Sequence, residues 1–219
     1  MIKLVVFDWN GVLIADLQAV IAVDAILFKK FGHDPIDAKL YQEIFTMPVR
    51  DFFLAAGFKK EEMDRHAKEI QELFHELFEP RIARVRTRAG ARTLLSFLEE
   101  RKIEAKILSN HTEMSIHAHL KRLRIEKYFS DVISNDKHTT MQKKNKADKL
   151  VDLVVKSHYK KEEILIIGDS LEEIEAARAS GIRCVSITGD YYSARRLKAA
   201  KPDFLINNLT EMIDIIKNV

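Results

Sequence analysis

Three apolar runs of this chain are each followed, directly or after a single glycine, by a residue that can bind a cation or a phosphate. These residues are Asp8 after 2–7, Ser109 after 105–108 and Asp169 after 164–167. A carboxylate in such a place can act as a nucleophile or as a ligand of a hard cation. A serine hydroxyl near the start of a helix can donate to a phosphate oxygen. Taken singly, Asp8 and Ser109 are better explained by a turn and a helix cap, whereas Asp169 has no such simple explanation.

Two further features add charge to this set. Residues 143–149 read Lys-Lys-Asn-Lys-Ala-Asp-Lys and precede or open a helix, where a cation opposes the helix dipole. Neutralising a phosphate or a group of carboxylates would explain one of these lysines, and a solvated loop explains the others. Glu173 follows Asp169 by one helical turn, so the two carboxylates would share a helix face and can hold Mg²⁺ together.

The remaining pattern predicts the elements that must position these residues. Short β-branched runs at 2–7, 105–108, 131–134, 164–167, 183–187 and 204–206 alternate with helical periodicity at 91–101, 113–124, 146–158, 171–180 and 191–200. This alternation predicts an α/β fold, with a mostly parallel, Rossmann-like sheet and helices on both faces. In such a sheet, ligands bind beyond the carboxyl ends of the strands, so we expect the residues above to meet there.

The segment 15–80 is different, because it contains no convincing strand. Its periodicity predicts helices at 16–31, 38–45, 49–56 and 60–78. Eight of the twelve phenylalanines lie here, at positions 28, 31, 45, 52, 53, 58, 74 and 78, and we expect them to form the core of a small helical bundle rather than a ligand site. We therefore predict a helical cap domain over 15–81, inserted into an α/β core of residues 1–14 and 82–219.

The composition excludes several classes of protein. Of 219 residues, 47% are hydrophobic and 32% charged, so the chain can bury a core and is not disordered. A net charge of +3 is too small for a nucleic-acid binder, and no apolar run approaches the ~18 residues of a membrane span. The single cysteine, Cys184, has no partner for an intrachain disulfide. We predict a soluble, cytoplasmic protein without nucleic-acid or membrane partners, and the sequence predicts no oligomeric state.

Together these motifs resemble those of the haloacid dehalogenase superfamily of hydrolases, over essentially the whole chain. Asp8 with Gly11 matches the first motif, Ser109 the second, a lysine within 143–149 the third, and Gly168-Asp169 the fourth. Gly181, at the end of an alanine-rich helix, matches the glycine that precedes the next strand in this family. The segment 15–81 resembles the helical cap that many members carry between the first two motifs.

The resemblance implies a Mg²⁺-dependent phosphatase that acts on a small phosphorylated metabolite. In such enzymes the first aspartate attacks phosphorus and forms an aspartyl-phosphate, which water then hydrolyses. Carried over, Asp8 is the nucleophile and a metal ligand, Asn10 lends its backbone carbonyl, and Asp169 is the acidic ligand. Glu173 stands where many members have aspartate, and we expect its longer side chain to reach the metal only through water.

The resemblance also implies a set of substrate-binding residues. Ser109 and Asn110 would hold phosphoryl oxygens together with one lysine. Lys146 and Lys144 both fit the place of that lysine, and we prefer Lys146 because it opens the predicted helix. Arg50, which follows a break between two helices of the cap, is a candidate to reach a substrate carboxylate.

One departure from the family pattern leaves two alternatives open. Asn10 stands where the phosphatases carry a second aspartate, which protonates the leaving group. General acid–base catalysis contributes typically ~10²–10⁴-fold, so we expect slow turnover of poor leaving groups. A 2-haloacid dehalogenase also lacks this acid but needs no metal, and Gly168-Asp169 argues against it. A weakly catalytic protein that binds a phosphorylated ligand is the other alternative, supported by Asn10 alone.

Overall fold

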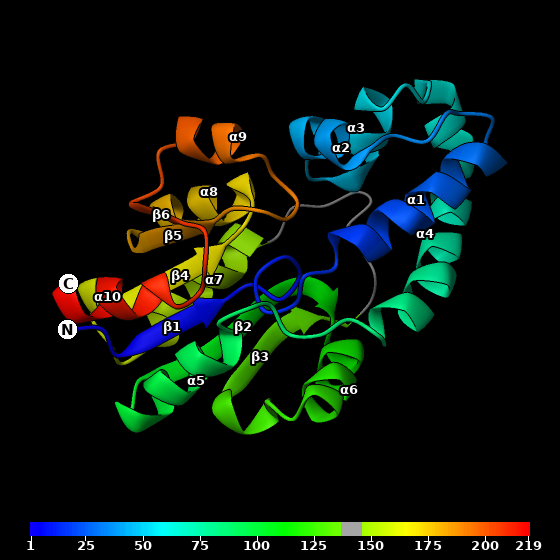
Figure 1. Cartoon of the computed structure of the whole chain (residues 1–219). Coiled ribbons are helices and arrows are strands. Elements are labelled where there is room, and N and C mark those ends of the chain that lie inside the picture. The colour runs from blue at the N-terminus through cyan, green and yellow to red at the C-terminus, as the bar shows by residue number, and fades with distance from the viewer. Residues whose placement is uncertain (137–145) are drawn as a thin grey trace.

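A computed structural model describes residues 1–136 and 146–219 of the chain. Its centre is a parallel sheet of six strands in the order β3-β2-β1-β4-β5-β6 (Figure 1). The strands are β1 Leu4–Phe7, β2 Glu104–Thr112, β3 Asp131–Asn135, β4 Ile164–Gly168, β5 Arg183–Ile187 and β6 Phe204–Ile206. The predicted α/β fold with a parallel sheet is confirmed.

The two central strands bring the first and fourth motifs side by side. All residues of β1 and β4 are buried, as expected for strands covered on both faces. Phe7 pairs with Ile167 in the parallel register, so the two strands end at the same level. Asp8 and Gly168-Asp169 therefore leave the sheet next to each other.

Strand β2 is longer than the sequence pattern indicates. It continues four residues past the predicted end at 108 and ends at Thr112, so Ser109 and Asn110 lie within the strand. The next helix starts at Glu113 with Thr112 as its N-cap residue. The expectation that Ser109 caps this helix is wrong, and its hydroxyl instead accepts a hydrogen bond from His111 N at 3.1 Å.

Helices cover both faces of the sheet, as predicted. Figure 1 shows α5, α6 and α10 over one face, with α7 and α8 over the other. The helices of this part are α5 Ala91–Glu100, α6 Glu113–Leu123, α7 Lys146–Lys156, α8 Leu171–Ser180, α9 Ala194–Ala199 and α10 Glu211–Asn218. Helix α10 lies outside the predicted elements. Helix α9 starts later than expected from 191–200, because the Ser193 hydroxyl caps it by accepting from Arg196 N.

The four helices expected between the first two strands are present. They are α1 Leu17–Lys30, α2 Ala38–Ile44, α3 Val49–Ala55 and α4 Lys60–Ile82. Helix α4 runs past its predicted end at 78 and through Pro80, whose missing N–H removes only one backbone hydrogen bond in the last turn. These helices lie beyond the carboxyl ends of the strands, with α1 and α4 packed together (Figure 1). The division of the chain at 14/15 and 81/82 stays a prediction.

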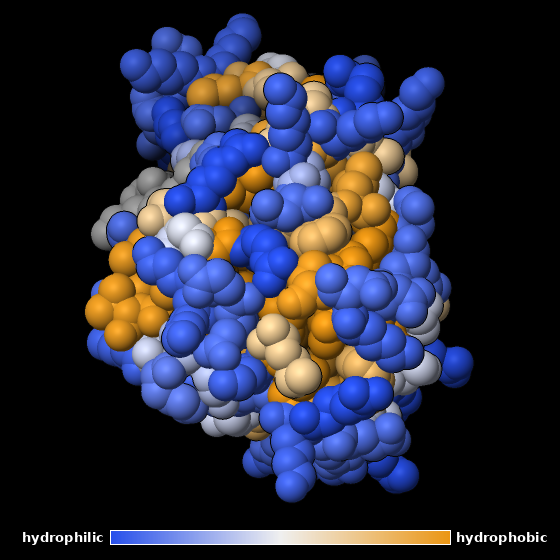
Figure 2. All heavy atoms as spheres, turned by 90° about the vertical axis from the view of Figure 1, so that its left-hand side faces the viewer, coloured by the Kyte–Doolittle hydropathy of each residue, from blue (hydrophilic) through white to orange (hydrophobic). Residues whose placement is uncertain are grey.

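The surface is mostly hydrophilic on the face at the left of Figure 1. Figure 2 shows this face, with hydrophilic side chains around the rim and hydrophobic ones visible between them. Such a mixture is normal, since more than half of a folded protein's accessible surface comes from apolar atoms. Within residues 1–136 and 146–219, no helix combines the length and the apolar character that crossing a membrane requires.

Candidate active site

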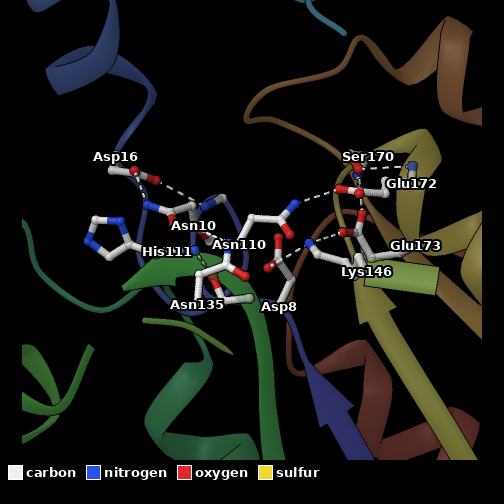
Figure 3. Close-up of polar contacts among 12 residues, drawn as sticks. Asp8, Asn10, Asp16, Asn110, His111, Asn135, Lys146, Ser170, Glu172 and Glu173 are labelled. Atoms are coloured by element: carbon white, nitrogen blue, oxygen red, sulfur yellow. Dashed lines mark hydrogen bonds and ion pairs between the residues drawn. The ribbon is translucent and has the colours of Figure 1, made fainter. Parts of the chain in front are cut away.

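The carboxyl ends of β1, β2 and β4 open into one cavity of about 160 Å³. Its lining includes six of the predicted site residues, namely Asp8, Asn10, Ser109, Asn110, Lys146 and Asp169. Figure 3 shows Asp8, Lys146 and Glu173 pointing toward one another from β1, α7 and α8. The expectation that the motif residues meet at this edge of the sheet is therefore confirmed for the described part of the chain. Lys144 lies outside the described residues.

Lys146 connects two of the carboxylates. Its Nζ lies 3.0 Å from Asp8 Oδ1 and also forms an ion pair with Glu173 Oε1. All three side chains are buried. Burial alone would lower the pKa of Lys146, but the charges of Asp8 and Glu173 outweigh it and hold this pKa well above its usual range. The ammonium group is therefore permanently charged beside Asp8.

Glu173 has protein partners on both of its carboxylate oxygens. Oε1 faces Lys146, while Oε2 accepts hydrogen bonds from Ser170 N at 2.9 Å and from Ser170 Oγ at 2.6 Å. The bonds to Ser170 form a capping box that starts α8. Burial raises the pKa of Glu173, and Lys146 outweighs this effect and lowers it overall. A Cβ on Gly168 would lie 2.0 Å from Glu173 Cγ, which explains why glycine precedes Asp169.

Asp169 is held against the loop that follows β1. Its Oδ2 accepts a hydrogen bond from Tyr191 N at 2.9 Å. A Cβ on Gly11 would lie 2.2 Å from the same oxygen, and Gly11 has φ +73°, so both space and backbone conformation require glycine here. Burial, followed by the charges of Asp190 and Asp8, raises the pKa of Asp169 well above its usual value.

Asp8, Asp169 and Glu173 together fit a divalent cation. One carboxylate oxygen of each lies within 4.8 Å of the others. Burial raises the pKa of Asp8 to about 7, and the Glu173 charge adds to this, although Lys146 opposes it. Buried carboxylates repel one another, and a bound cation relieves this repulsion. Their oxygen atoms are the donors that a hard cation prefers. The donor set therefore fits a divalent metal, with Asp8 and Asp169 keeping an oxygen that no ion pair occupies.

Asn10 is bound to a carboxylate that sequence reasoning missed. Its Nδ2 donates to Asp16 Oδ2 at 2.6 Å, while Gly11 N and the Tyr191 hydroxyl donate to Asp16 at 3.0 and 2.9 Å. Asp16 is fully buried, and burial raises its pKa. In the sequence Asp16 stands where a helix begins, which hides this role because aspartate is common there. The Asp16 side chain accepts no capping hydrogen bond from the backbone of α1.

The amide of Asn110 is used within the protein. Its Nδ2 donates to Glu172 Oε2 at 2.8 Å, and Asn135 Nδ2 donates to the backbone carbonyl of Asn110 at 2.7 Å. Asn110 Oδ1 is buried without a hydrogen-bond partner in the described part of the chain. His111 is buried on β2, with Nε2 2.9 Å from Ser115 Oγ.

The wall of the cavity opposite the sheet comes from α1–α4. Five of the eight phenylalanines of this region line the cavity, at positions 45, 52, 53, 74 and 78. They pack on one another as predicted for a bundle core, and the same side chains border the cavity. Arg50 is not among the described lining residues and pairs instead with Asp64 on α4.

Helix α2 is fastened to the sheet side of the cavity. Gln42 Nε2 donates to the Asp190 carbonyl at 2.6 Å. Arg196 Nη1 on α9 donates to the carbonyls of Gln42 and Phe45, at 3.0 and 2.8 Å. The Phe45 and Tyr191 rings are in contact, with centroids 5.1 Å apart. The helical region is thus closed over the site.

Comparisons with known proteins agree with this architecture. Residues 5–187 match a family described as haloacid dehalogenase-like hydrolase. A phosphoglycolate phosphatase from Synechococcus elongatus is 26% identical over 212 residues, covering 97% of this chain and 96% of that protein. One from Pseudomonas fluorescens is 29% identical over 219 residues, covering 96% of this chain and 78% of that protein. The solved structure of a haloacid dehalogenase-like hydrolase from Streptococcus pneumoniae has a TM-score of 0.82 at 20% identity, covering 98% of both chains.

Proposed function

The chain belongs to the family of haloacid dehalogenase-like hydrolases and is a phosphatase, and we propose that it hydrolyses small phosphate monoesters through Asp8 with the aid of Mg²⁺. The observation that carries this proposal is the meeting of Asp8, Asp169 and Lys146 in one buried cavity at the carboxyl edge of the sheet. Phosphoryl transfer depends mainly on positioning and charge neutralisation, which such a set of groups supplies.

Asp8 is the proposed nucleophile. Its carboxylate forms a bond to phosphorus as the bond between phosphorus and the alcohol oxygen breaks. Water then hydrolyses the aspartyl-phosphate, which releases phosphate and restores the carboxylate. The Lys146 ammonium, 3.0 Å from Asp8 Oδ1, favours the ionised form of Asp8 that attack requires.

Ser109 and Lys146 are the proposed phosphate ligands. Ser109 lines the cavity at the end of β2, and its hydroxyl is free to donate because it accepts from His111 N. Lys146 supplies the positive charge, and Glu173 positions it. Asn110 completes this edge of the site, with its amide oriented by Glu172.

Asp8, Asp169 and the backbone carbonyl of Asn10 are the proposed metal-holding groups. Both Glu173 oxygens have protein partners, so Glu173 acts on the metal site through Lys146 or through water. When bound, Mg²⁺ neutralises charge that develops on the phosphoryl oxygens. Asp8 and Asp169 would hold it through their carboxylates, beside the proposed nucleophile.

The leaving oxygen finds no general acid at Asn10. The amide of Asn10 cannot give up a proton near neutral pH, and its N–H is bound to Asp16. We therefore expect the enzyme to turn over activated esters faster than simple alkyl phosphates, with a difference of up to ~10²–10⁴-fold.

A phosphate-release assay tests this function. Small phosphate monoesters, including 4-nitrophenyl phosphate, are offered with Mg²⁺ and with EDTA. EDTA should abolish release, and Asp8→Asn should reduce it roughly 10³-fold or more. Asp152→Asn is the matched control, because Asp152 is exposed on α7 and pairs only with Lys156 among the described residues.

Two other results would replace the proposal. Halide release from 2-haloacids that continues in EDTA would indicate a dehalogenase. Saturable, Mg²⁺-dependent binding of phosphate without turnover of any ester would indicate a protein that binds a phosphorylated ligand.

A further inference from the structure

The cavity continues from the phosphate site into the helical region, where its wall is mostly apolar but also includes Tyr41, Gln71 and His75. The apolar side chains of this wall include Phe45, Phe52, Phe53, Ile70, Phe74 and Phe78. A volume of about 160 Å³ for the whole cavity suits a leaving group of the size of one ring or a short branched chain.

Asp24 is the carboxyl group that faces this apolar part. It lies on α1 one helical turn after Val20, and both residues line the cavity. Only 4% of Asp24 is exposed. No residue in the described ranges donates a hydrogen bond to its carboxyl group, and burial raises its pKa well above the usual value. An unpartnered polar group in an apolar wall is costly, so a ligand that supplies a donor would offset this cost.

Among the described lining residues, no lysine or arginine is left outside an ion pair to receive an anionic leaving group. Among the lining residues that the structure describes, Lys146 is the sole lysine or arginine, and it is paired with Asp8 and Glu173. Arg50 is directed away to Asp64. A carboxylate on the leaving group would instead lie among phenylalanines, which disfavours it by desolvation.

We infer that the substrate is a phosphate monoester of an apolar, ring-sized alcohol that carries a hydrogen-bond donor, a hydroxyl or an amine, placed to meet Asp24. This inference rests on the proposed phosphatase function and specifies its substrate class. It separates this chain from the phosphoglycolate phosphatases that it resembles, since the name of those relatives specifies a leaving group that bears a carboxylate.

Four benzyl phosphates of similar size test the inference. They carry hydrogen, hydroxymethyl, aminomethyl or carboxylate at the para position, and their benzylic leaving groups have similar acidity, so the lack of an acid at Asn10 affects them alike. In the wild-type enzyme, kcat/KM should be higher for the hydroxymethyl and aminomethyl compounds than for the carboxylate by roughly 10²-fold or more. Phosphoglycolate should be as poor a substrate as the carboxylate.

Two variants of Asp24 locate the preference. Asp24→Leu removes the acceptor and should lower kcat/KM for the hydroxymethyl and aminomethyl compounds about tenfold to a hundredfold, to the level of benzyl phosphate. The kcat/KM for benzyl phosphate should change little. Asp24→Asn keeps the size and an acceptor oxygen but removes the ionisable group, so it should lower kcat/KM for the aminomethyl compound more than for the hydroxymethyl compound. Asp24→Asn also serves if Asp24→Leu fails to fold.

Hydrolysis of 4-nitrophenyl phosphate, with Asp8→Asn as its control, distinguishes the two possible failures. If the wild-type enzyme hydrolyses none of the esters, the proposed function fails and this inference fails with it. If it hydrolyses 4-nitrophenyl phosphate but prefers the carboxylate or phosphoglycolate, the inference is overturned and the proposed function stands. The same holds if both Asp24 variants keep the wild-type order of substrates.

Discussion

Asn10 Nδ2 donates a 2.6 Å hydrogen bond to Asp16 Oδ2, so the residue that replaces the usual acid is held by a buried carboxylate (Figure 3). The Tyr191 hydroxyl donates to the same oxygen at 2.9 Å. Asp16 thus fixes the amide of Asn10 and the side of the loop that carries Asp190 and Tyr191. A buried carboxylate thus lies in direct contact with the Asn10 side chain.

Asn10→Asp should restore general acid catalysis. The new carboxyl group would lie against Asp16, and two adjacent carboxyls in a buried site retain a proton because both cannot ionise. We expect kcat for simple alkyl phosphates to rise by roughly 10²-fold or more, with little change for 4-nitrophenyl phosphate. Steady-state kinetics on both substrates measure this. The double variant Asn10→Asp, Asp16→Asn is the control, and an equal gain on both substrates would contradict the explanation.

Lys146→Met should damage both activity and stability. It leaves the Glu173 carboxylate buried without its charged partner, and breaking a buried ion pair costs about 3–5 kcal/mol of unfolding free energy. Phosphate release should fall by the same order as for Asp8→Asn, because the phosphate loses its cation. Urea denaturation and phosphate release measure the two effects. Lys156→Met is the control, since Lys156 is exposed and pairs only with Asp152 among the described residues, and a stability loss equal to that of Lys146→Met would contradict the role of burial.

The sheet and the meeting of the motifs could be predicted because short, fully buried strands carry a strong local signal. Ile164–Gly168 is apolar and is followed at once by Asp169. The sharp turn at Gly11 and the close approach at Gly168 also leave a trace in the sequence, because only glycine fits either place. These are properties of neighbouring residues, which a single sequence contains.

Contacts between distant segments could not be predicted in the same way. By sequence alone, Asp16 is typical of a helix start, Asp24 of the polar face of a helix, and His111 of a loop. All three are buried by elements that lie elsewhere in the chain. Asp24 is enclosed only when α1 packs on α4 and α2, and His111 only when β2 extends to Thr112. The aromatic wall of the cavity was missed for the same reason, since periodicity identifies a buried face but not the space that it borders.

Asp190→Asn should change the pH dependence of stability. Burial, followed by the charge of Asp16, raises the pKa of Asp190 to about 8, although Arg88 opposes this. In the unfolded chain an aspartate has a pKa of about 3.9, so between these values the native state holds a proton that the unfolded state does not. Wild-type stability therefore falls as pH rises through this window. From pH 4 to pH 8, the unfolding free energy of the variant should therefore increase relative to that of the wild type, by at most about 1.4 kcal/mol per pH unit. Urea denaturation in EDTA at several pH values measures it, and a constant difference would contradict the assignment.

Arg196→Ala should loosen the helical region without unfolding the sheet. The guanidinium donates to the carbonyls of Gln42 and Phe45, at 3.0 and 2.8 Å, and so ties α9 to the end of α2. Hydrogen bonds from a charged group contribute about 1.5–3 kcal/mol, so amide exchange in α2 should accelerate about tenfold or more while exchange in β1 and β4 stays unchanged. Hydrogen exchange measured by mass spectrometry resolves these segments.

Arg195→Ala is the matched control for this prediction. Arg195 is the neighbouring residue, its side chain is 76% exposed, and its ion pair with Glu43 also reaches α2. An exposed ion pair contributes about 0–1 kcal/mol, so exchange in α2 should hardly change. Because α2 carries Tyr41 and leads into Phe45, both of which line the cavity, Arg196→Ala should also raise KM for ring-sized substrates, including 4-nitrophenyl phosphate. Equal exchange rates in the two variants would contradict the role of the Arg196 contacts with the carbonyls of Gln42 and Phe45.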